Sequence, residues 1–196
     1  MVLKGLLLVV FCYLIGSLPF SYIISRWLGQ LDIREHGSGN VGATNVLRTL
    51  GWQAAVVAMV GDVLKGTVAA WLGTMGGGGL ILAGCCLAVV LGHCYPVFLS
   101  FRGGKGVATS AGVFLYLAPG ALFILLGFFL LVVVIFRYVS LGSILSALLA
   151  PFAVIFLYQH RPWMVTVAIL LALVIIYRHR ENIDRLRRGK EPKIFS

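Results

Sequence analysis

The chain has 196 residues, of which 60% are hydrophobic and only 11% are charged, and its formal net charge is +10. A soluble domain keeps roughly a quarter of its residues charged, so this sequence has too few charges to cover a surface that faces water. The composition excludes an ordinary soluble protein and predicts an all-α integral membrane protein, because helices satisfy their own backbone hydrogen bonds inside a bilayer.

The apolar sequence divides into seven segments, so we expect about seven transmembrane helices. Pro and Gly residues mark most of the boundaries between them. The first segment could pass for a secretory signal, but no small-residue cleavage site follows and Arg26 ends it, so we interpret it as a retained helix. The fourth segment is short enough to be a half-span. The segments cover about residues 2–25, 52–72, 80–99, 107–118, 121–136, 141–157 and 163–177.

The Lys and Arg residues are concentrated on one side of this topology. Of the 16, 13 fall in one set of loops and the C-terminal tail, whereas only Lys4 and Arg161 fall on the opposite side. The positive-inside rule places the basic side in the cytoplasm, with the N-terminus outside and the C-terminus inside. Basic residues arranged in this way would set the orientation of the protein in the membrane and contact anionic lipid head groups or an anionic ligand. We therefore expect no nucleic-acid partner. The basic regions are about 26–51, 100–106, 137–140 and 178–196.

The first basic loop contains EHGSGNVGATNVLRTLG at residues 35–51, with the spacing Gly-x-Gly-x-x-Gly. In a dinucleotide-binding fold this spacing joins a strand to a helix in a soluble unit, whereas membrane segments flank it here, so we reject that interpretation. A glycine-rich turn still lets backbone N–H groups surround a phosphate, and an arginine suits phosphate well. The alternative is an ordinary capped turn. The residues that we expect to contribute to a phosphate site are Ser38, Gly39, Asn40, Thr44, Asn45 and Arg48.

The second segment carries two ionisable residues, Asp62 and Lys65, at membrane depth. Such residues are costly inside a bilayer and are usually paired or functional, so a structural ion pair and support for a site both remain open. His93, near the end of the third segment, is expected to pack or to bond locally near a helix end. The four cysteines lie in apolar stretches without metal-ligand spacing, so we expect neither a disulfide nor a metal.

The stretch FRGGKG at residues 101–106 is a second glycine-rich element. It is not a P-loop, because Gly106 follows the lysine where a serine or threonine is needed. A positive-inside anchor would explain the charges but not three glycines around a lysine. We therefore expect a phosphate site at Gly103, Gly104, Lys105 and Gly106, with Arg102 before the glycines. The two glycine-rich loops would bind two phosphates or hold one phosphate from both sides.

The last polar elements are Ser143, which opens the sixth segment beside Arg137, and the C-terminal tail. Ser143 would cap its helix or donate to a ligand. In the tail, His179 and Asn182 are three residues apart and share one face of a helix. All the polar stretches lie on the same predicted membrane face, which is the layout of one site assembled from loops on a helical scaffold.

Taken together, GSGNVGATNVLR, GHCYPVFLSFRGGKGVATSAGV and HRENIDRLRRGKEP resemble the three signature regions of the bacterial PlsY family, the acyl-phosphate:glycerol-3-phosphate acyltransferases. The resemblance extends over nearly the whole chain. It implies a single membrane-embedded acyltransferase domain over residues 1–196, in the bacterial inner membrane, with a cytoplasmic active site. The implied reaction moves a fatty acyl group from acyl phosphate to the 1-hydroxyl of glycerol 3-phosphate, giving lysophosphatidic acid and phosphate in the first step of phospholipid synthesis. No cofactor and no metal are implied, and the partners are the two substrates and membrane lipids.

The resemblance also implies roles for matching residues. His179 would orient or deprotonate the attacking hydroxyl or stabilise the departing phosphate, although a substrate phosphate oxygen is an alternative base. The other residues implied to be catalytic are Asn182, Lys105, Ser38 and Arg48. Those implied to bind substrate or phosphate are Gly39, Asn40, Thr44, Asn45, Gly103, Gly104, Gly106 and Ser143.

A transporter or binding protein for phosphorylated solutes is the strongest alternative from another class. It would also need cationic sites in a helical bundle. It predicts inverted repeats and a site near the middle of the membrane. The sequence has no convincing internal repeat, and its polar motifs gather at one predicted face, so we favour the enzyme.

Overall fold

The computed structural model describes residues 2–159 and 161–194. Within these residues all regular structure is helical, which confirms the expected all-α class. The chain packs as two compact units that divide between Tyr116 and Leu117. The expectation of one acyltransferase domain over the whole chain stays a prediction.

Five helical segments among the described residues are long and apolar enough to cross a membrane. A sixth is possible if α9 (Pro162–Arg178) and α10 (Arg180–Arg187), which meet at an angle of 58°, form one broken span. Helix α6 (Val107–Leu117) has 11 residues and is therefore about 16 Å long, well short of a bilayer core. The count of seven spans and the orientation of the termini remain predictions. The five long segments are Leu3–Gly29, Trp52–Thr74, Gly79–Leu99, Pro119–Phe136 and Val139–Leu157.

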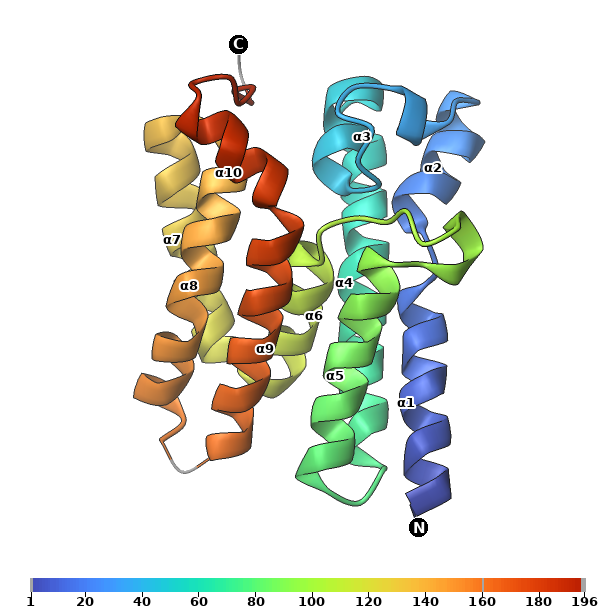
Figure 1. Cartoon of the computed structure of the whole chain (residues 1–196), viewed down its shortest axis with the longest axis vertical. Helices are drawn as coiled ribbons and strands as arrows, with labels where there is room; N and C mark the ends of the chain where they lie inside the picture. Colours follow the sequence, from blue (N-terminus) through green and yellow to red (C-terminus); the bar gives the residue numbers. More distant parts are fainter. Residues whose placement is uncertain (1, 160, 195–196) are drawn as a thin grey trace. The chain divides into compact units, whose positions relative to one another are not determined.

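The first unit contains more helices than its hydropathy predicts (Figure 1). The first apolar segment is interrupted before Pro19, which has no N–H to continue the helix. The polar loop expected at 26–51 contains the end of one helix, a 3₁₀ turn and a helix of its own. In order, the elements are α1 (Val2–Gly16), α2 (Phe20–Gly29), η1 (Ile33–Glu35), α3 (Ala43–Leu50), α4 (Trp52–Thr74), α5 (Gly79–Cys94), η2 (Val97–Leu99) and α6.

Glycines allow two pairs of helices in this unit to approach backbone to backbone. A side chain at Gly16 or Gly92 would overlap a carbonyl oxygen where α1 crosses α5. A side chain at Gly66 or Gly112 would do the same where α4 crosses α6. Close contacts between small residues are the usual means of joining helices in lipid, because lipid gives little hydrophobic drive for association.

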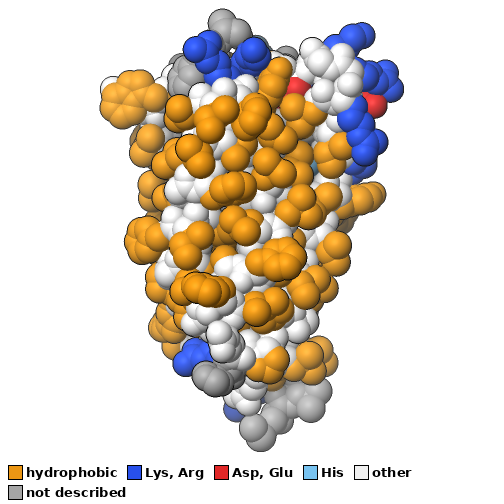
Figure 2. Space-filling model, turned by 90° about the vertical axis from the view of Figure 1, so that its left-hand side faces the viewer, with side chains coloured by type: hydrophobic (Ala, Val, Ile, Leu, Met, Phe, Trp, Pro, Cys, Tyr) orange, Lys and Arg blue, Asp and Glu red, His pale blue; other side chains and the backbone are white. Residues whose placement is uncertain are grey.

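In the second unit, α7 (Pro119–Phe136) packs on α8 (Val139–Leu157), and α8 packs on α9. The Ser146 hydroxyl on α8 donates to the Leu125 carbonyl of α7 at 3.3 Å. Large apolar side chains point outward, for example Phe123 at 68% exposed and Phe156 at 75%. Figure 2 shows one face of the molecule, with hydrophobic side chains over its middle and Lys and Arg side chains gathered mainly at the upper end of the view. This pattern fits a molecule whose sides face lipid.

Candidate active site

The first glycine-rich loop is organised around the buried side chain of Asn45, which is 1% exposed. Its Oδ1 accepts a hydrogen bond from the backbone N–H of Ser38 at 2.9 Å. Its Nδ2 donates to the carbonyl oxygens of Ile33 at 3.1 Å, His36 at 2.9 Å and Asn40 at 3.1 Å. The side chain of Asn45 is thereby engaged entirely by the loop, so it holds the shape of the loop.

The glycines of this loop have distinct conformational tasks. Gly37 and Gly39 adopt φ angles of +59° and +68°, in the left-handed region that other residues avoid. The next glycine, Gly42, is extended and precedes α3, whose first turn presents backbone N–H groups at the end of the loop. Ser38 at the tip of the loop and Arg48 in the last turn of α3 are exposed. Thr44, the second residue of α3, is half-buried.

The second glycine-rich loop wraps around His93 at the end of α5. The Gly104 N–H donates to the His93 carbonyl at 3.1 Å. A side chain at Gly103 would overlap that same carbonyl, and one at Gly104 would overlap Nε2 of the imidazole. Gly106 has a φ of +84° and ends the loop before α6, with Lys105 half-buried beside it. The loop therefore needs glycine at 103 and 104 because it lies directly against His93.

Gly104 also joins the two glycine-rich loops of the first unit. A Cβ at Gly104 would lie 2.5 Å from the carbonyl oxygen of Val41, which belongs to the first loop. The two loops, separated by about 60 residues of sequence, thus touch at Val41 and Gly104. The structure brings together the two stretches that the sequence assigns to phosphate.

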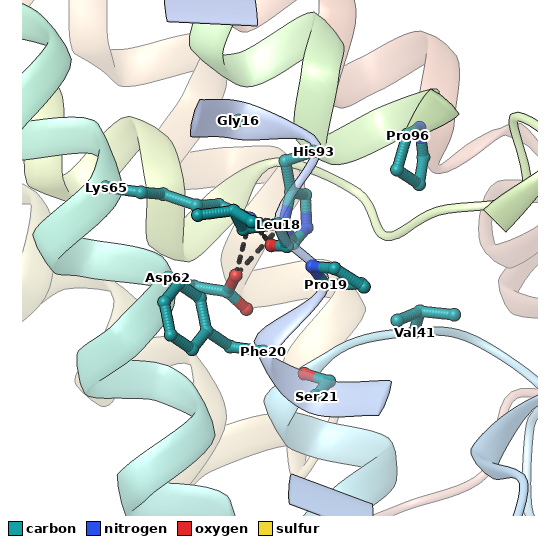
Figure 3. Close-up of a pocket in the computed structure, with 10 residues that line it drawn as sticks. All are labelled: Gly16, Leu18, Pro19, Phe20, Ser21, Val41, Asp62, Lys65, His93 and Pro96. Carbon is teal, nitrogen blue, oxygen red and sulfur yellow. Dashed lines mark hydrogen bonds and ion pairs between the residues drawn. The ribbon is translucent and has the colours of Figure 1, made fainter. Parts of the chain in front are cut away.

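Asp62, Lys65 and His93 form a buried polar cluster next to the second glycine-rich loop, which lies against His93. Figure 3 shows these three side chains. The Lys65 ammonium is 2.7 Å from Asp62 Oδ1, and both side chains are 2% exposed. It also lies 2.9 Å from His93 Nδ1. His93 is buried near the end of α5, as expected, but the alternative that its ring bonds locally is wrong, because α4 and α5 pack together and bring Lys65 to the ring. Asp62 and Lys65 form the ion pair that the sequence left open.

In the second unit, His179 and Asn182 are both buried where α9 bends into α10. The Nδ1 of His179 lies 2.8 Å from the Ile175 carbonyl oxygen one turn earlier. A carbonyl only accepts, so Nδ1 carries the proton and, in the neutral ring, Nε2 keeps its lone pair. This tautomer is the one that a general base at Nε2 needs.

Glu191 is a residue that the sequence reasoning missed. Its Oε1 accepts from Asn182 Nδ2 at 2.6 Å, and its Oε2 accepts from Arg185 Nε at 2.8 Å. Burial alone would raise the pKa of Glu191, but the neighbouring Ser140 hydroxyl and the hydrogen bonds from Asn182 and Arg185 lower that pKa below its ordinary value. The only signal in the sequence was an acidic residue between lysine and proline in a basic tail. That signal did not indicate which residues Glu191 would contact.

Ser143 is buried in the first turns of α8, where its hydroxyl donates to the Val139 carbonyl at 2.9 Å. The structure contradicts the capping alternative for this residue. Helix α8 begins after Tyr138, and no side chain caps it. Of the residues expected to be catalytic, Ser38, Arg48 and Lys105 lie in the first unit, and His179 and Asn182 lie in the second.

A family model described as glycerol-3-phosphate acyltransferase matches residues 6–189. The chain belongs to this family. A glycerol-3-phosphate acyltransferase of Syntrophomonas wolfei is 55% identical over 188 residues, which are 95% of either chain. The protein of the same name in Bacillus subtilis is 42% identical over 191 residues, 96% of either chain.

Two solved structures of a family member also match. One is the crystal structure of PlsY (YgiH), an integral membrane glycerol 3-phosphate acyltransferase, in its glycerol 3-phosphate form. It superposes with a TM-score of 0.91 at 42% identity, over 97% of this chain and 95% of that one. The second is its lysophosphatidic acid form, with a TM-score of 0.89 at 41% identity and the same coverage. The resemblance to the PlsY family inferred from the sequence motifs is confirmed.

Proposed function

We propose that this chain transfers a fatty acyl group from acyl phosphate to the 1-hydroxyl of glycerol 3-phosphate, releasing lysophosphatidic acid and phosphate. The observation that carries the proposal is the near-complete match to a PlsY structure in its glycerol 3-phosphate form. The related structure in its lysophosphatidic acid form carries the acylated product of the same reaction.

The chemistry of acyl phosphate suits the residues of this chain. Both substrates carry a phosphate, and the chain has two glycine-rich loops with a nearby arginine or lysine. Phosphate is a good leaving group, so the donor arrives already activated. The enzyme then needs mainly to align the hydroxyl with the carbonyl carbon and to stabilise developing negative charge. A covalent acyl-enzyme on Ser38 would add a step without lowering this requirement.

The first unit supplies the phosphate-binding part of the proposal. Lys105 and the backbone of the second glycine-rich loop hold one phosphate, as N–H groups in a glycine nest and a lysine point charge do elsewhere. Arg48, with Ser38 at the tip of the first loop, contacts a phosphate from α3. Asn45 contributes by holding the loop in shape, because its side chain is already engaged by four hydrogen bonds. Gly39, Asn40 and Thr44 complete the same loop.

The second unit supplies the proton-transfer part. His179 accepts the proton of the 1-hydroxyl at Nε2 while Nδ1 stays bonded to Ile175, or it holds that hydroxyl for a phosphate oxygen that takes the proton. Asn182 is oriented by Glu191, whose oxygen accepts one of the amide protons at 2.6 Å. Because this hydrogen bond fixes the Asn182 side chain, its second amide N–H and its amide oxygen point in fixed directions.

The proposed setting is the bacterial inner membrane, with the N-terminus outside and the motifs at the cytoplasmic face. The bias of the basic residues supports this orientation. Glycerol 3-phosphate is water-soluble and reaches the motifs from the cytoplasm. The acyl chain of the donor and of the product stays in the bilayer, so only the reacting head group needs to reach the polar loops.

The decisive experiment reconstitutes the purified protein in lipid vesicles with acyl phosphate and glycerol 3-phosphate, and measures phosphate and lysophosphatidic acid together. Equal release of both products with acyl phosphate, and no turnover with acyl-CoA, is the expected result. Phosphate release without acylated glycerol phosphate would refute the acceptor. Turnover with acyl-CoA at a comparable rate would refute the donor.

A matched pair of variants in the tail controls for surface charge and folding. Asn182→Ala removes a proposed catalytic residue, whereas Arg188→Ala removes an exposed partner of Asp184 on the same helix. We expect Asn182→Ala to lose at least about 100-fold in turnover and Arg188→Ala to keep it. Equal activity of the two variants would remove Asn182 from the mechanism.

A further inference from the structure

The buried cluster of Asp62, Lys65 and His93 (Figure 3) has none of the roles given above, and its His93 lies directly against the second glycine-rich loop. Lys65 has three N–H donors, and three acceptors surround it. These are Asp62 Oδ1 at 2.7 Å, His93 Nδ1 at 2.9 Å and the Leu18 carbonyl oxygen at 3.0 Å. The ammonium therefore ties the break between α1 and α2, the middle of α4 and the end of α5 to one point.

His93 Nδ1 lies between the two charged groups of the cluster. It is 2.9 Å from the Lys65 ammonium, which only donates, and 3.3 Å from Asp62 Oδ1, which only accepts. The shorter contact, with the ammonium, favours the tautomer that has the lone pair on Nδ1 and the proton on Nε2. The two contacts together fix the orientation of the His93 ring.

The opposite edge of His93 is the surface on which the second glycine-rich loop lies. The Nε2 atom occupies the space that a Cβ at Gly104 would need. The His93 carbonyl accepts the Gly104 N–H at 3.1 Å and leaves no room for a side chain at Gly103. Any rotation of the imidazole would push the loop and move Lys105, which follows Gly104 directly.

We propose that Asp62, Lys65 and His93 are positioning residues for the phosphate-binding loop Gly103–Gly106. This inference rests on the proposed function for the identity of the ligand, a substrate phosphate. Lys65 and Asp62 fix the His93 ring, the ring fixes the loop from below, and the loop presents Lys105 and its N–H groups. None of the three touches the substrate.

Stability alone does not account for an ion pair at this depth. Replacing a buried pair by apolar residues of similar volume is often neutral or stabilising, whereas removing one partner is strongly destabilising. A pair that only held helices together would be replaceable in this way. A pair that orients an imidazole would not be, because apolar side chains offer no donor to Nδ1.

The first test compares two substitutions of His93 that keep opposite halves of the ring. In His93→Asn the amide oxygen takes the place of Nδ1 and accepts from Lys65, but the edge under Gly104 is lost. In His93→Gln the amide nitrogen takes the place of Nε2 under Gly104, but the acceptor for Lys65 is lost. The control is Ser21→Ala, because Ser21 lines the same hollow and has no part in the cluster.

Affinity for phosphate is the measured quantity, as the thermal stabilisation of detergent-purified protein by glycerol 3-phosphate and by inorganic phosphate, together with KM and kcat. We expect His93→Asn and His93→Gln each to weaken phosphate binding about tenfold, because each variant keeps only one of the two contacts of the ring and small displacements of binding groups are costly. Ser21→Ala should equal the wild type. Equal phosphate affinity in His93→Asn and the wild type overturns the proposal.

The double variant Asp62→Leu/Lys65→Met separates positioning from folding. It should keep the unfolding temperature of the wild type and show the same loss of phosphate affinity as His93→Asn. A stable double variant with unchanged KM for both substrates and unchanged stabilisation by phosphate overturns the proposal, even if His93→Asn fails to fold. Absence of acyl transfer by the wild type would refute the proposed function. The stabilisation by phosphate measures binding to the loop and needs no turnover, so it tests the positioning proposal separately.

Discussion

Substitution of Asn45 by aspartate would keep the shape of the side chain and remove the two amide protons that hold the first glycine-rich loop. The Oδ1 atom would still accept from the Ser38 N–H. The atom that replaces Nδ2 would face the carbonyl oxygens of Ile33, His36 and Asn40, all within 3.1 Å, without a proton to offer them. The substitution creates no cavity, so its effects are the loss of these hydrogen bonds and the introduction of a buried carboxylate beside carbonyl oxygens.

The expected cost follows from these contacts. Two protons serve three acceptors, so two net hydrogen bonds of about 1 kcal/mol each are lost, and the buried carbonyl oxygens then face another acceptor. A total of about 2–4 kcal/mol would lower the ratio of closed to open loop roughly 30-fold to several hundred-fold. Ser38 would lose its fixed position, and activity should fall with the population of the closed loop.

Limited proteolysis and kinetics together test this prediction. Arg34 and Glu35 flank the loop and are exposed, so trypsin and a glutamate-specific protease report its opening. Thr49→Ala is the matched control, because the Thr49 hydroxyl bonds only to carbonyl groups of its own helix α3. If Asn45→Asp showed the cleavage rate and kcat/KM of Thr49→Ala, Asn45 would not be what holds the loop.

Three further substitutions probe the remaining parts of the site. Gly104→Ala should lower kcat/KM by at least about tenfold by forcing the loop off His93, while Gly127→Ala, which meets nothing within 4 Å, should be silent in the same assay. His179→Ala should reduce kcat at least about 100-fold while glycerol 3-phosphate still binds, and full turnover would end its catalytic role. Because folding lowers the pKa of Glu191, its ionised form adds stability above the ordinary value of 4.5, and this stability is lost as the pH falls through the lower, folded pKa. The unfolding temperature of Glu191→Gln should therefore be lower than that of the wild type near neutral pH. In thermal melts between about pH 3 and 7, it should also change less with pH than that of the wild type.

The sequence predicts the membrane helices well because hydropathy is a local property. The seven apolar segments all contain helices in the structure, and only their lengths limit which of them can span. The break before Pro19 was missed because the apolar residues continue through it. Helix α3 was missed because eight residues of mixed polarity after a glycine-rich turn look like loop.

In the candidate site, the backbone conformation of the glycine-rich loops was predictable, because glycine is the residue type that such turns require. Glycines with positive φ, such as Gly37 and Gly106, have a recognisable signature in the sequence. The partners of buried polar groups had none. Lys65 meets His93 across 28 residues, and Glu191 meets Asn182 only after the tail turns back, so neither contact is encoded in a local pattern.

The glycine contacts that join α1 to α5 and α4 to α6 have a consequence for the surrounding bilayer. Helices locked backbone to backbone cannot tilt one at a time to match a thicker or thinner membrane. The first unit must respond to hydrophobic mismatch as one body, so the lipid around it has to stretch or compress instead. An acyltransferase of this kind works in a bilayer whose thickness depends on the acyl chains of its lipids, so the fit between the first unit and its membrane changes with those chains.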